Sequence, residues 1–272
     1  MWLKVYFRLL VKFVLHIVTG KSQISRIVQK PFKPELNISM ITSLSASKRL
    51  REHHEKFVSG GIDVEEFFNI IVDVKSVHND HHETLLRYLT SYSSIKSISN
   101  DLLTTMKTGF DANDNNHMRY LDTMYTVLFD RKKPDDEDLV VNVNWTTVGF
   151  QQPKITSDFR GAGVLGITFM DYMATFQAAR FKKLAKNIPL FGIVVINLVC
   201  EFNDRLQSGD LNLMLLRALH TSKDTLNSEF VFRIWGRLVA EFWTIYEKEI
   251  GDITQFEMSK KPIIERVILD QI

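Results

Sequence analysis

Apolar residues recur at helical spacing along most of this sequence. The segment 225–249 illustrates the pattern, with large apolar residues at Trp235, Leu238, Phe242 and Ile245. Steps of three or four residues place these side chains on one face of a helix. A helix of this kind buries its apolar face, so we interpret the four residues as core and not as a cofactor site.

Similar patterns extend over most of the remaining chain, and strand-like alternation is confined to a few residues near 139–143. The other segments with helical spacing are 39–57, 64–77, 85–106, 116–129, 164–184, 190–206, 211–220 and 254–271. We therefore predict an all-α fold, with one large multi-helical domain and an N-terminal amphipathic helix.

Local signals mark the ends of several predicted helices. Asp63 is followed three residues later by Glu66, which forms a capping box in its aspartate version at the start of 64–77. Pro189 suits the first turn of the helix that follows it, because its missing N–H needs no partner there. Gly209 suits a C-terminal stop.

Two prolines and an acidic run indicate boundaries. Pro31 and Pro34 predict a linker near 30–37 that is not helical throughout, and the acidic residues at 135–138 predict a solvated loop. We expect three parts, namely a basic amphipathic helix at 1–29, a helical region at 30–114 and the main helical domain at 115–272.

The composition is that of a folded protein with balanced charge. The 272 residues are 45% hydrophobic, which is enough for a sizeable core, and the formal net charge is +2. A nucleic-acid binder normally shows a clustered basic face, so we expect no nucleic-acid partner. Cys200 is the only cysteine, which excludes an intrachain disulfide and favours a reducing compartment.

Residues 1–18 combine large apolar side chains with regularly spaced basic ones. Lys4, Arg8, Lys12 and His16 recur every fourth residue, along one stripe of a helix. About 17 helical residues span roughly 25 Å, less than the hydrocarbon core of roughly 30 Å, and the stripe would place cations inside it. We favour a helix in a membrane interface, where Lys4, Arg8 and Lys12 contact anionic headgroups.

Other interpretations of this segment differ in what they require. A secretory signal normally keeps its charge at the front and ends at a small-residue cleavage site, which is not clear here. A helix packed on the protein's own core and a signal anchor in the endoplasmic reticulum membrane remain alternatives. The favoured interpretation predicts a location at the cytosolic face of an intracellular membrane.

Two groups of polar residues resemble metal-binding motifs without matching them. His78, His81, His82 and Glu83 lie close in sequence. Adjacent histidines on a helix point about 100° apart, and no partner with a zinc-type spacing follows. We interpret these residues as a solvated first helical turn.

The second group, at 111–116, resembles the start of a calcium loop. The calcium motif requires glycine at its sixth position and a bidentate glutamate at its twelfth, where this chain has Asn116 and Asp122. We interpret the group as a polar loop that caps the helix at 116–129, and we expect no metal site.

Gly161, Gly163 and Gly166 have the spacing of a dinucleotide fingerprint. That spacing is meaningful only after a buried strand and with an acidic residue about 20 positions later. Residues 156–160 do not form a buried strand pattern, and 182–187 contain no acid. We therefore exclude a nicotinamide or flavin enzyme.

The stretch from Trp145 to Gly166 has the composition of a loop that displays one side chain on a helical scaffold. Its Arg160 is permanently charged and offers forked donors, which suits insertion into a phosphate site of another protein. The flanking Gly161 and Gly163 would let the backbone approach a partner. Alternatively, the arginine is structural, because Asp158 pairs with it or caps the following helix.

These residues resemble the signature of the ELMO domain, in the form found in ELMO-domain-containing (ELMOD) proteins. The matching positions are Trp145, Gly149, Phe150, Gln151, Asp158, Phe159, Arg160, Gly161 and Gly163. The resemblance extends less sharply over 115–272, including Ile196-Asn197 and 206–211.

The resemblance implies a GTPase-activating protein for Arf and Arf-like small GTPases, in which Arg160 matches the catalytic arginine. Such a protein has no cofactor of its own, since GTP and Mg²⁺ are carried by the partner GTPase. Related ELMO scaffold proteins generally lack the arginine. On this basis Asp158 and Gln151 would orient Arg160, and Trp145 would anchor the loop.

The loop departs from the family pattern at two positions. The family usually has glycine where this chain has Gln152, and proline where it has Ile155. The alternative function is a non-catalytic ELMO-type helical scaffold that binds a GTPase or a membrane-traffic partner.

Overall fold

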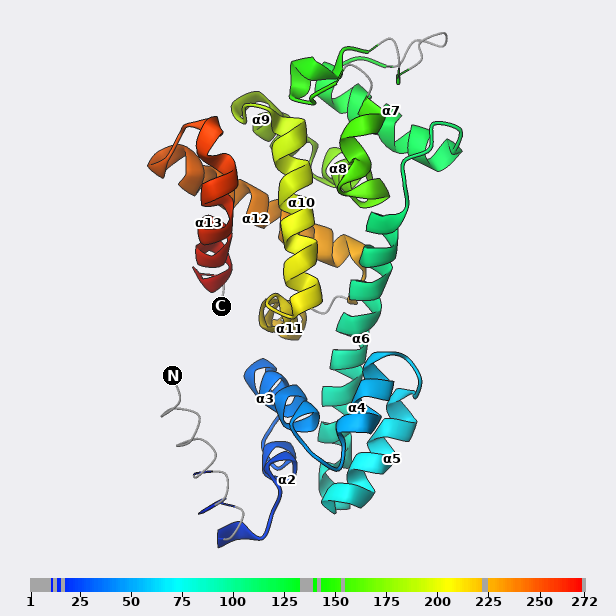
Figure 1. Ribbon diagram of the computed structural model, residues 1–272, viewed down its shortest axis with the longest axis vertical. Coiled ribbons are helices and arrows are strands. Elements are labelled where there is room, and N and C mark those ends of the chain that lie inside the picture. The colour runs from blue at the N-terminus through cyan, green and yellow to red at the C-terminus, as the bar shows by residue number, and fades with distance from the viewer. Residues whose placement is uncertain are drawn as a thin grey trace. The chain divides into compact units, whose positions relative to one another are not determined.

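The computed structural model describes residues 11, 14–15, 18–132, 139–140, 143–152, 155–221 and 225–270. All regular secondary structure in these ranges is α-helical or 3₁₀-helical, which confirms the all-α prediction (Figure 1). The helices belong to two compact units. The N-terminal unit comprises the chain up to Ser97 together with Leu216–Thr221, and the C-terminal unit comprises Ile98–Leu215 and the chain from Ser222 onward.

The N-terminal unit packs short helices around one apolar core. The most deeply buried core residues are Leu44, Leu50, Phe67, Ile71 and Leu85. Its elements are α2 (Gln23–Val28), α3 (Pro34–Ser45), α4 (Arg51–Val58), α5 (Val64–Lys75), the 3₁₀-helix η1 (Asn79–His81) and the first part of α6 (His82–Lys107).

Of the capping box predicted at Asp63, the structure contains the bond that Asp63 accepts, but none from its own N–H to the Glu66 side chain. The Asp63 carboxylate accepts a hydrogen bond of 2.8 Å from the backbone N–H of Glu66, in the first turn of α5. This bond satisfies one of the N–H groups that a helix start leaves without a partner.

The predicted continuous helix at 39–57 is wrong, because α3 and α4 are separated by 46–50. Leu44 and Leu50 are both fully buried. Six positions apart on one continuous helix, they would point about 120° apart, so the break lets both reach one core. The non-helical linker is also shorter than predicted, because α3 begins at Pro34.

The C-terminal unit is built around α8, which contacts α7, α9, α10 and α12. Most of its residues are buried. Besides the end of α6, the elements of the chain from Ile98 onward are α7 (Asn115–Phe129), η2 (Trp145–Val148), η3 (Ile155–Arg160), α8 (Gly163–Phe176), α9 (Ala178–Asn187), α10 (Phe191–Ser208), α11 (Asn212–Thr221), α12 (Ser228–Glu249), η4 (Ile253–Gln255) and α13 (Phe256–Asp270).

The predicted helix at 164–184 is divided into α8 and α9. Phe176 at the end of α8 is 62% exposed, and Gln177 leaves the helical conformation at φ −135°. The turn brings Phe181 of α9 against Phe191 of α10, with ring centroids 5.3 Å apart. No glycine or proline marks the turn, so the hydrophobic pattern alone does not reveal it.

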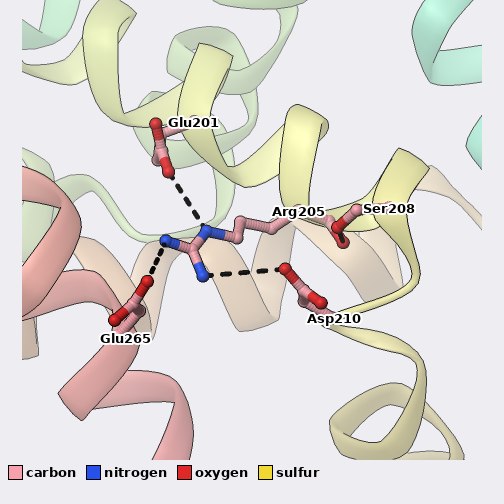
Figure 2. A network of polar contacts seen from close by, with 5 residues as sticks. All are labelled: Glu201, Arg205, Ser208, Asp210 and Glu265. Atoms are coloured by element: carbon pink, nitrogen blue, oxygen red, sulfur yellow. Dashed lines mark hydrogen bonds and ion pairs between the residues drawn. The ribbon is translucent and has the colours of Figure 1, made fainter.

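Arg205 joins three parts of the C-terminal unit (Figure 2). Its guanidinium lies 3.1 Å from the carboxylates of Glu201 on α10 and of Glu265 on α13, and 3.6 Å from that of Asp210 in the turn after α10. Gly209 ends α10 in the left-handed conformation, with φ +89°, which confirms the predicted stop.

The predictions for the N-terminal segment fall mostly outside the described residues, as Lys4, Arg8 and Lys12 do. Val14 and Val18 are described, and they expose 47% and 75% of their surfaces. In the described part of the chain, no single helix is long and apolar enough to cross a membrane. The pair α9 and α10 meets that criterion of length and composition only together, with a bend of 113° between the two helices.

Candidate functional site

Trp145 begins the loop of interest and lies in the core of the C-terminal unit. Its side chain is fully buried, and its indole N–H donates a hydrogen bond of 2.7 Å to the backbone oxygen of Leu139. Its ring meets that of Phe129 edge to face, with centroids 5.7 Å apart. The loop is therefore attached to α7 at its first residue. Leu139 itself lies in a turn and not in the strand-like segment suggested by its surroundings.

A row of aromatic rings continues from Trp145 beneath the loop. Phe150 lies 5.8 Å from Trp145 and 6.0 Å from Phe159, and Phe159 stacks on Phe110 at 5.7 Å. Both phenylalanines of the loop are buried. Aromatic contacts of this kind fix the loop at two separate points along its length.

Gly149 allows the loop backbone to lie directly against the start of α10. Its φ is +83°, and a Cβ at this position would lie 2.2 Å from the backbone nitrogen of Phe191. The carbonyl oxygen of Gly149 accepts a hydrogen bond of 3.2 Å from the N–H of Ile193. A side chain at residue 149 is therefore excluded by both backbone conformation and space.

Asp158 closes the loop by accepting hydrogen bonds from backbone N–H groups earlier in the loop. Its Oδ2 lies 2.9 Å from the backbone nitrogen of Gln151 and 3.3 Å from that of Gln152. Neither of the two roles expected from the sequence, an ion pair with Arg160 or a cap on α8, is present. The reason is that η3 directs the carboxylate toward the start of the loop, where two N–H groups converge.

The environment of Asp158 is partly desolvated. Burial raises the pKa of this carboxyl above its ordinary value, while the N–H groups of Gln152 and Gln151 and the charge of Arg160 act in the opposite direction. Gln151 donates its backbone N–H to Asp158, and Gln151 is exposed to solvent. The contact that the structure shows for Gln151 is therefore with Asp158 and not with Arg160, and its role in orienting Arg160 stays a prediction.

Arg160 is the last residue of η3 and is exposed. Its Nε donates a hydrogen bond of 2.9 Å to the backbone oxygen of Ser157, which directs the side chain. Among the described residues, no carboxylate lies within ion-pair distance of the guanidinium. Its one hydrogen bond that the structure describes therefore uses Nε.

The two glycines after Arg160 have different environments. Gly163 has φ +53°, and a Cβ there would lie 2.0 Å from the backbone oxygen of Met106. It therefore serves a close contact with the end of α6, where the N–H of Val164 donates 2.8 Å to Thr108. Gly163 itself is buried, so its close packing within the protein accounts for a glycine at this position.

Gly161, by contrast, is exposed, and a Cβ built on it would meet no atom nearer than the Sγ of Cys200 at 4.0 Å. Burial, together with the charge of Asp204, raises the pKa of the Cys200 thiol to about 11. Gly161 thus presents an exposed backbone beside Arg160.

The polar groups that resemble metal motifs have structural roles. Asp114 caps α7 by accepting hydrogen bonds from the N–H groups of Asn116 and His117, at 2.8 and 3.2 Å. His78 lies beside Asp80 at 3.2 Å. Within the described ranges, no group of three or more metal-ligating side chains converges. Likewise, the segment before Gly163 is a 3₁₀-helix rather than a strand.

One residue beside the loop, Leu190, is not marked by any pattern that we find in the sequence. Leu190 has φ +53° and is 52% exposed, and its backbone lies against Gly149, where a Cβ would approach its Cα to 2.5 Å. A leucine in the left-handed region is uncommon and strained. No local pattern marks it, because the constraint comes from a glycine 41 positions earlier.

Comparison with known proteins identifies the region that contains this loop. The model of the family described as ELMO/CED-12 matches residues 100–254. ELMO domain-containing protein B of Dictyostelium discoideum is 23% identical over 261 residues, which cover 92% of this chain and 86% of that protein. ELMO domain-containing protein 2 of Mus musculus is 24% identical over 275 residues, covering 96% and 91%. No solved structure matches at a comparable level of significance.

Proposed function

Because this chain belongs to the ELMO/CED-12 family, we propose that it is a GTPase-activating protein for an Arf or Arf-like small GTPase. The partner carries GTP, Mg²⁺ and the attacking water, and this chain supplies Arg160 rather than a complete active site. The observation that carries the proposal is the exposure of Arg160 at the end of a loop whose aromatic residues, Trp145, Phe150 and Phe159, are buried.

Arg160 acts on the charge that develops on the transferred phosphoryl group. A guanidinium inserted in trans neutralises this charge in a site from which water is excluded. Such an arginine typically contributes about 10³- to 10⁵-fold, or about 4 to 7 kcal/mol of barrier. The Nε bond to Ser157 leaves two Nη groups for forked contacts with phosphate oxygens.

The remainder of the loop holds Arg160 in position before the partner arrives. Trp145, Phe150 and Phe159 fix the loop to the core, and Asp158 ties its two ends together. A loop that is ordered in advance loses less conformational entropy on binding. These residues are therefore positioning residues in the proposal, whereas Gly161 provides access for the partner.

A non-catalytic scaffold that binds the GTPase is the alternative. It is favoured by the departures from the family pattern at Gln152 and Ile155. Ile155 is nevertheless fully buried at the start of η3, so the substitution for proline preserves an anchored loop. The scaffold predicts binding of the GTP-loaded partner without faster hydrolysis.

Single-turnover GTP hydrolysis by a panel of Arf and Arf-like GTPases tests the proposal. We expect the full-length protein to accelerate hydrolysis by at least one member, and Arg160→Ala to abolish the acceleration. Arg51→Ala, which removes an exposed arginine of α4, is the control and should behave like the parent protein. A folded protein that binds a GTP-loaded member but accelerates none would favour the scaffold.

We also propose that residues 1–18 bring the protein to the cytosolic face of an intracellular membrane. The exposed apolar side chains of Val14 and Val18 support this location. Cosedimentation with vesicles containing anionic lipid should fall when Lys4, Arg8 and Lys12 are changed together to glutamate. Undiminished cosedimentation would argue against an interfacial basic stripe.

A further inference from the structure

The N-terminal unit contains a cavity of about 680 Å³ whose charged lining is entirely basic. It lies where the segment before α2 meets the end of α5 and the following turn. We call it the basic pocket, and its basic lining residues are Lys21, Arg49, Lys75, His78 and His81. None of the described residues that line it is acidic. A cavity of this size suits a small-molecule ligand.

Arg49 and Lys75 of the basic pocket lie close enough for their charges to interact, and neither has a neutralising partner among the described residues. Burial, and then the charge of Arg49, lowers the pKa of Lys75 below its ordinary value. In the part of the chain that the structure describes, neither residue forms an ion pair. A second cavity of about 440 Å³ shares both residues and adds Lys48. Positive charge is therefore concentrated between two adjoining cavities.

The walls of the basic pocket are held in place by polar contacts. The hydroxyl of Ser25 donates a hydrogen bond of 3.1 Å to the backbone oxygen of Lys75, which joins α2 to the end of α5. Ser76 then adopts the left-handed conformation, with φ +48°, and ends α5. This turn leads to His78 at the rim, where Asp80 lies 3.2 Å away. The pocket is thus formed by fixed elements.

The ligand that matches this lining is an anion with several charges. Arg49 and Lys75 provide positive charge without an ion-pair partner among the described residues, and the lining serines provide hydroxyl groups. Phosphate groups are recognised by such side chains, with arginine offering forked donors and lysine a compact charge. A single small anion would fill only part of the volume, so a ring or chain carrying more than one phosphate fits better.

We propose that the basic pocket binds a polyol that carries two or more phosphate groups, either free or as the headgroup of a membrane lipid. Gly20 and Lys21 line the pocket and directly follow the N-terminal segment, whose described valines are exposed. The lipid source would therefore place this ligand beside the segment that we assign to a membrane. The proposal does not depend on Arg160 or on any effect on GTP hydrolysis.

Titration calorimetry of the full-length protein with inositol trisphosphate tests the site. We expect binding to weaken by about tenfold or more in Arg49→Glu, which reverses one pocket charge. Arg51→Glu is the matched control, because it makes the same change two residues away on an exposed residue outside the pocket. Lys75→Met, which keeps an apolar stem of similar length, provides a second pocket variant. Thermal melting checks that each variant is folded.

Vesicles distinguish the two sources of the ligand. If vesicles that contain a bisphosphorylated inositol lipid displace inositol trisphosphate from the protein, the ligand is a lipid headgroup. If these vesicles do not displace it, the ligand is the free polyol. Either result supports the pocket if the calorimetric loss is specific to Arg49→Glu and Lys75→Met. No binding of inositol trisphosphate, or equal loss in Arg51→Glu, would overturn the proposal. Equal competition by phosphatidylserine vesicles of matched total charge would also overturn it, since it indicates unspecific attraction.

Discussion

Gly163 lies so close to Met106 that a Cβ on residue 163 would be 2.0 Å from the methionine's backbone oxygen. The first turn of α8 is thereby packed directly on the end of α6, 57 residues earlier in the chain. This contact lies three residues after Arg160. The position of the arginine therefore depends on backbone packing inside the C-terminal unit as well as on the loop itself.

Gly163→Ala should destabilise the protein by about 2 to 4 kcal/mol, because it adds a backbone clash to the cost of positive φ. Urea denaturation measures the change. Gly161→Ala is the matched control, since a Cβ there has open space, and it should change stability by less than about 0.5 kcal/mol. Equal losses in both variants would contradict this account of Gly163.

Arg160→Lys should retain only a small part of the proposed stimulation of GTP hydrolysis, while Arg160→Ala should lose about 10³-fold or more. Lysine keeps the positive charge but lacks the forked donors. Both variants should melt within about 1 °C of the parent protein, because the side chain is exposed. Single-turnover assays at saturating protein give the rates, and near-normal stimulation by the alanine variant would remove Arg160 from the mechanism.

Asp158→Ala should destabilise the protein by about 1 kcal/mol, because the N–H groups of Gln151 and Gln152 lose their acceptor. Asp158→Asn keeps an acceptor oxygen and should cost less. Asp158→Asn should also reduce the proposed stimulation of GTP hydrolysis less than Asp158→Ala does. Chemical denaturation and single-turnover hydrolysis give the two readouts, and an equal effect of both changes would exclude the loop-closing role.

The difference in stability between the parent protein and Asp158→Asn should depend on pH, because the pKa of Asp158 is raised in the folded state. The folded state holds the proton more tightly than the unfolded state. The titration of Asp158 therefore reduces stability as pH rises from the unfolded pKa through the folded pKa. Asp158→Asn lacks this titration, so parent stability should fall relative to the variant from about pH 3.5 upward and then level off. A gap that moves in the opposite direction would contradict the raised pKa.

Cys200 should react slowly with a disulfide reagent in the native protein. Its pKa of about 11 means that the thiolate fraction at pH 8 is about 100-fold below that of a thiol with an ordinary pKa of 9.0. Labelling should accelerate by at least that factor in denaturing urea. Equal labelling rates with and without urea would show that the Cys200 thiol is not buried and that its pKa is not raised.

Leu190→Asn should stabilise the protein by about 0.5 to 1 kcal/mol, because asparagine tolerates the left-handed backbone and the leucine is half exposed. Leu86→Asn is the matched control. That leucine is 43% exposed within α6, where asparagine is a poorer helix former, so the same substitution should destabilise. Thermal melting compares the two, and the same sign for both would contradict the strain at Leu190.

The sequence predicts the helices of this protein better than their interruptions. The apolar spacing of α12 and the cap at Asp63 are local features, and the structure contains both. The breaks between α3 and α4 and at Gln177 are not marked by glycine or proline. They follow from the need to bury Leu50 and Phe181, which depends on residues distant in the sequence.

In the candidate site, too, local features are predictable from the sequence and contacts between distant residues are not. The composition around Arg160 indicates a loop that displays an arginine, and the residue is indeed exposed there. The partners of its neighbours were not predictable from spacing, because Asp158 accepts from the opposite end of the loop and Gly163 packs on Met106. Contacts between distant segments require the fold.

The ion-pair network of Arg205 has a consequence for how this family region can be isolated. The family match ends at residue 254, whereas Glu265, one of the three carboxylates around Arg205, belongs to α13. Phe256 of the same helix lies 5.9 Å from Phe242 and 6.0 Å from Tyr246, ring to ring. A fragment cut at the homology boundary would expose these rings on α12 and favour aggregation. The packing of the C-terminal unit thus includes α13, which lies beyond the residues that the family model matches.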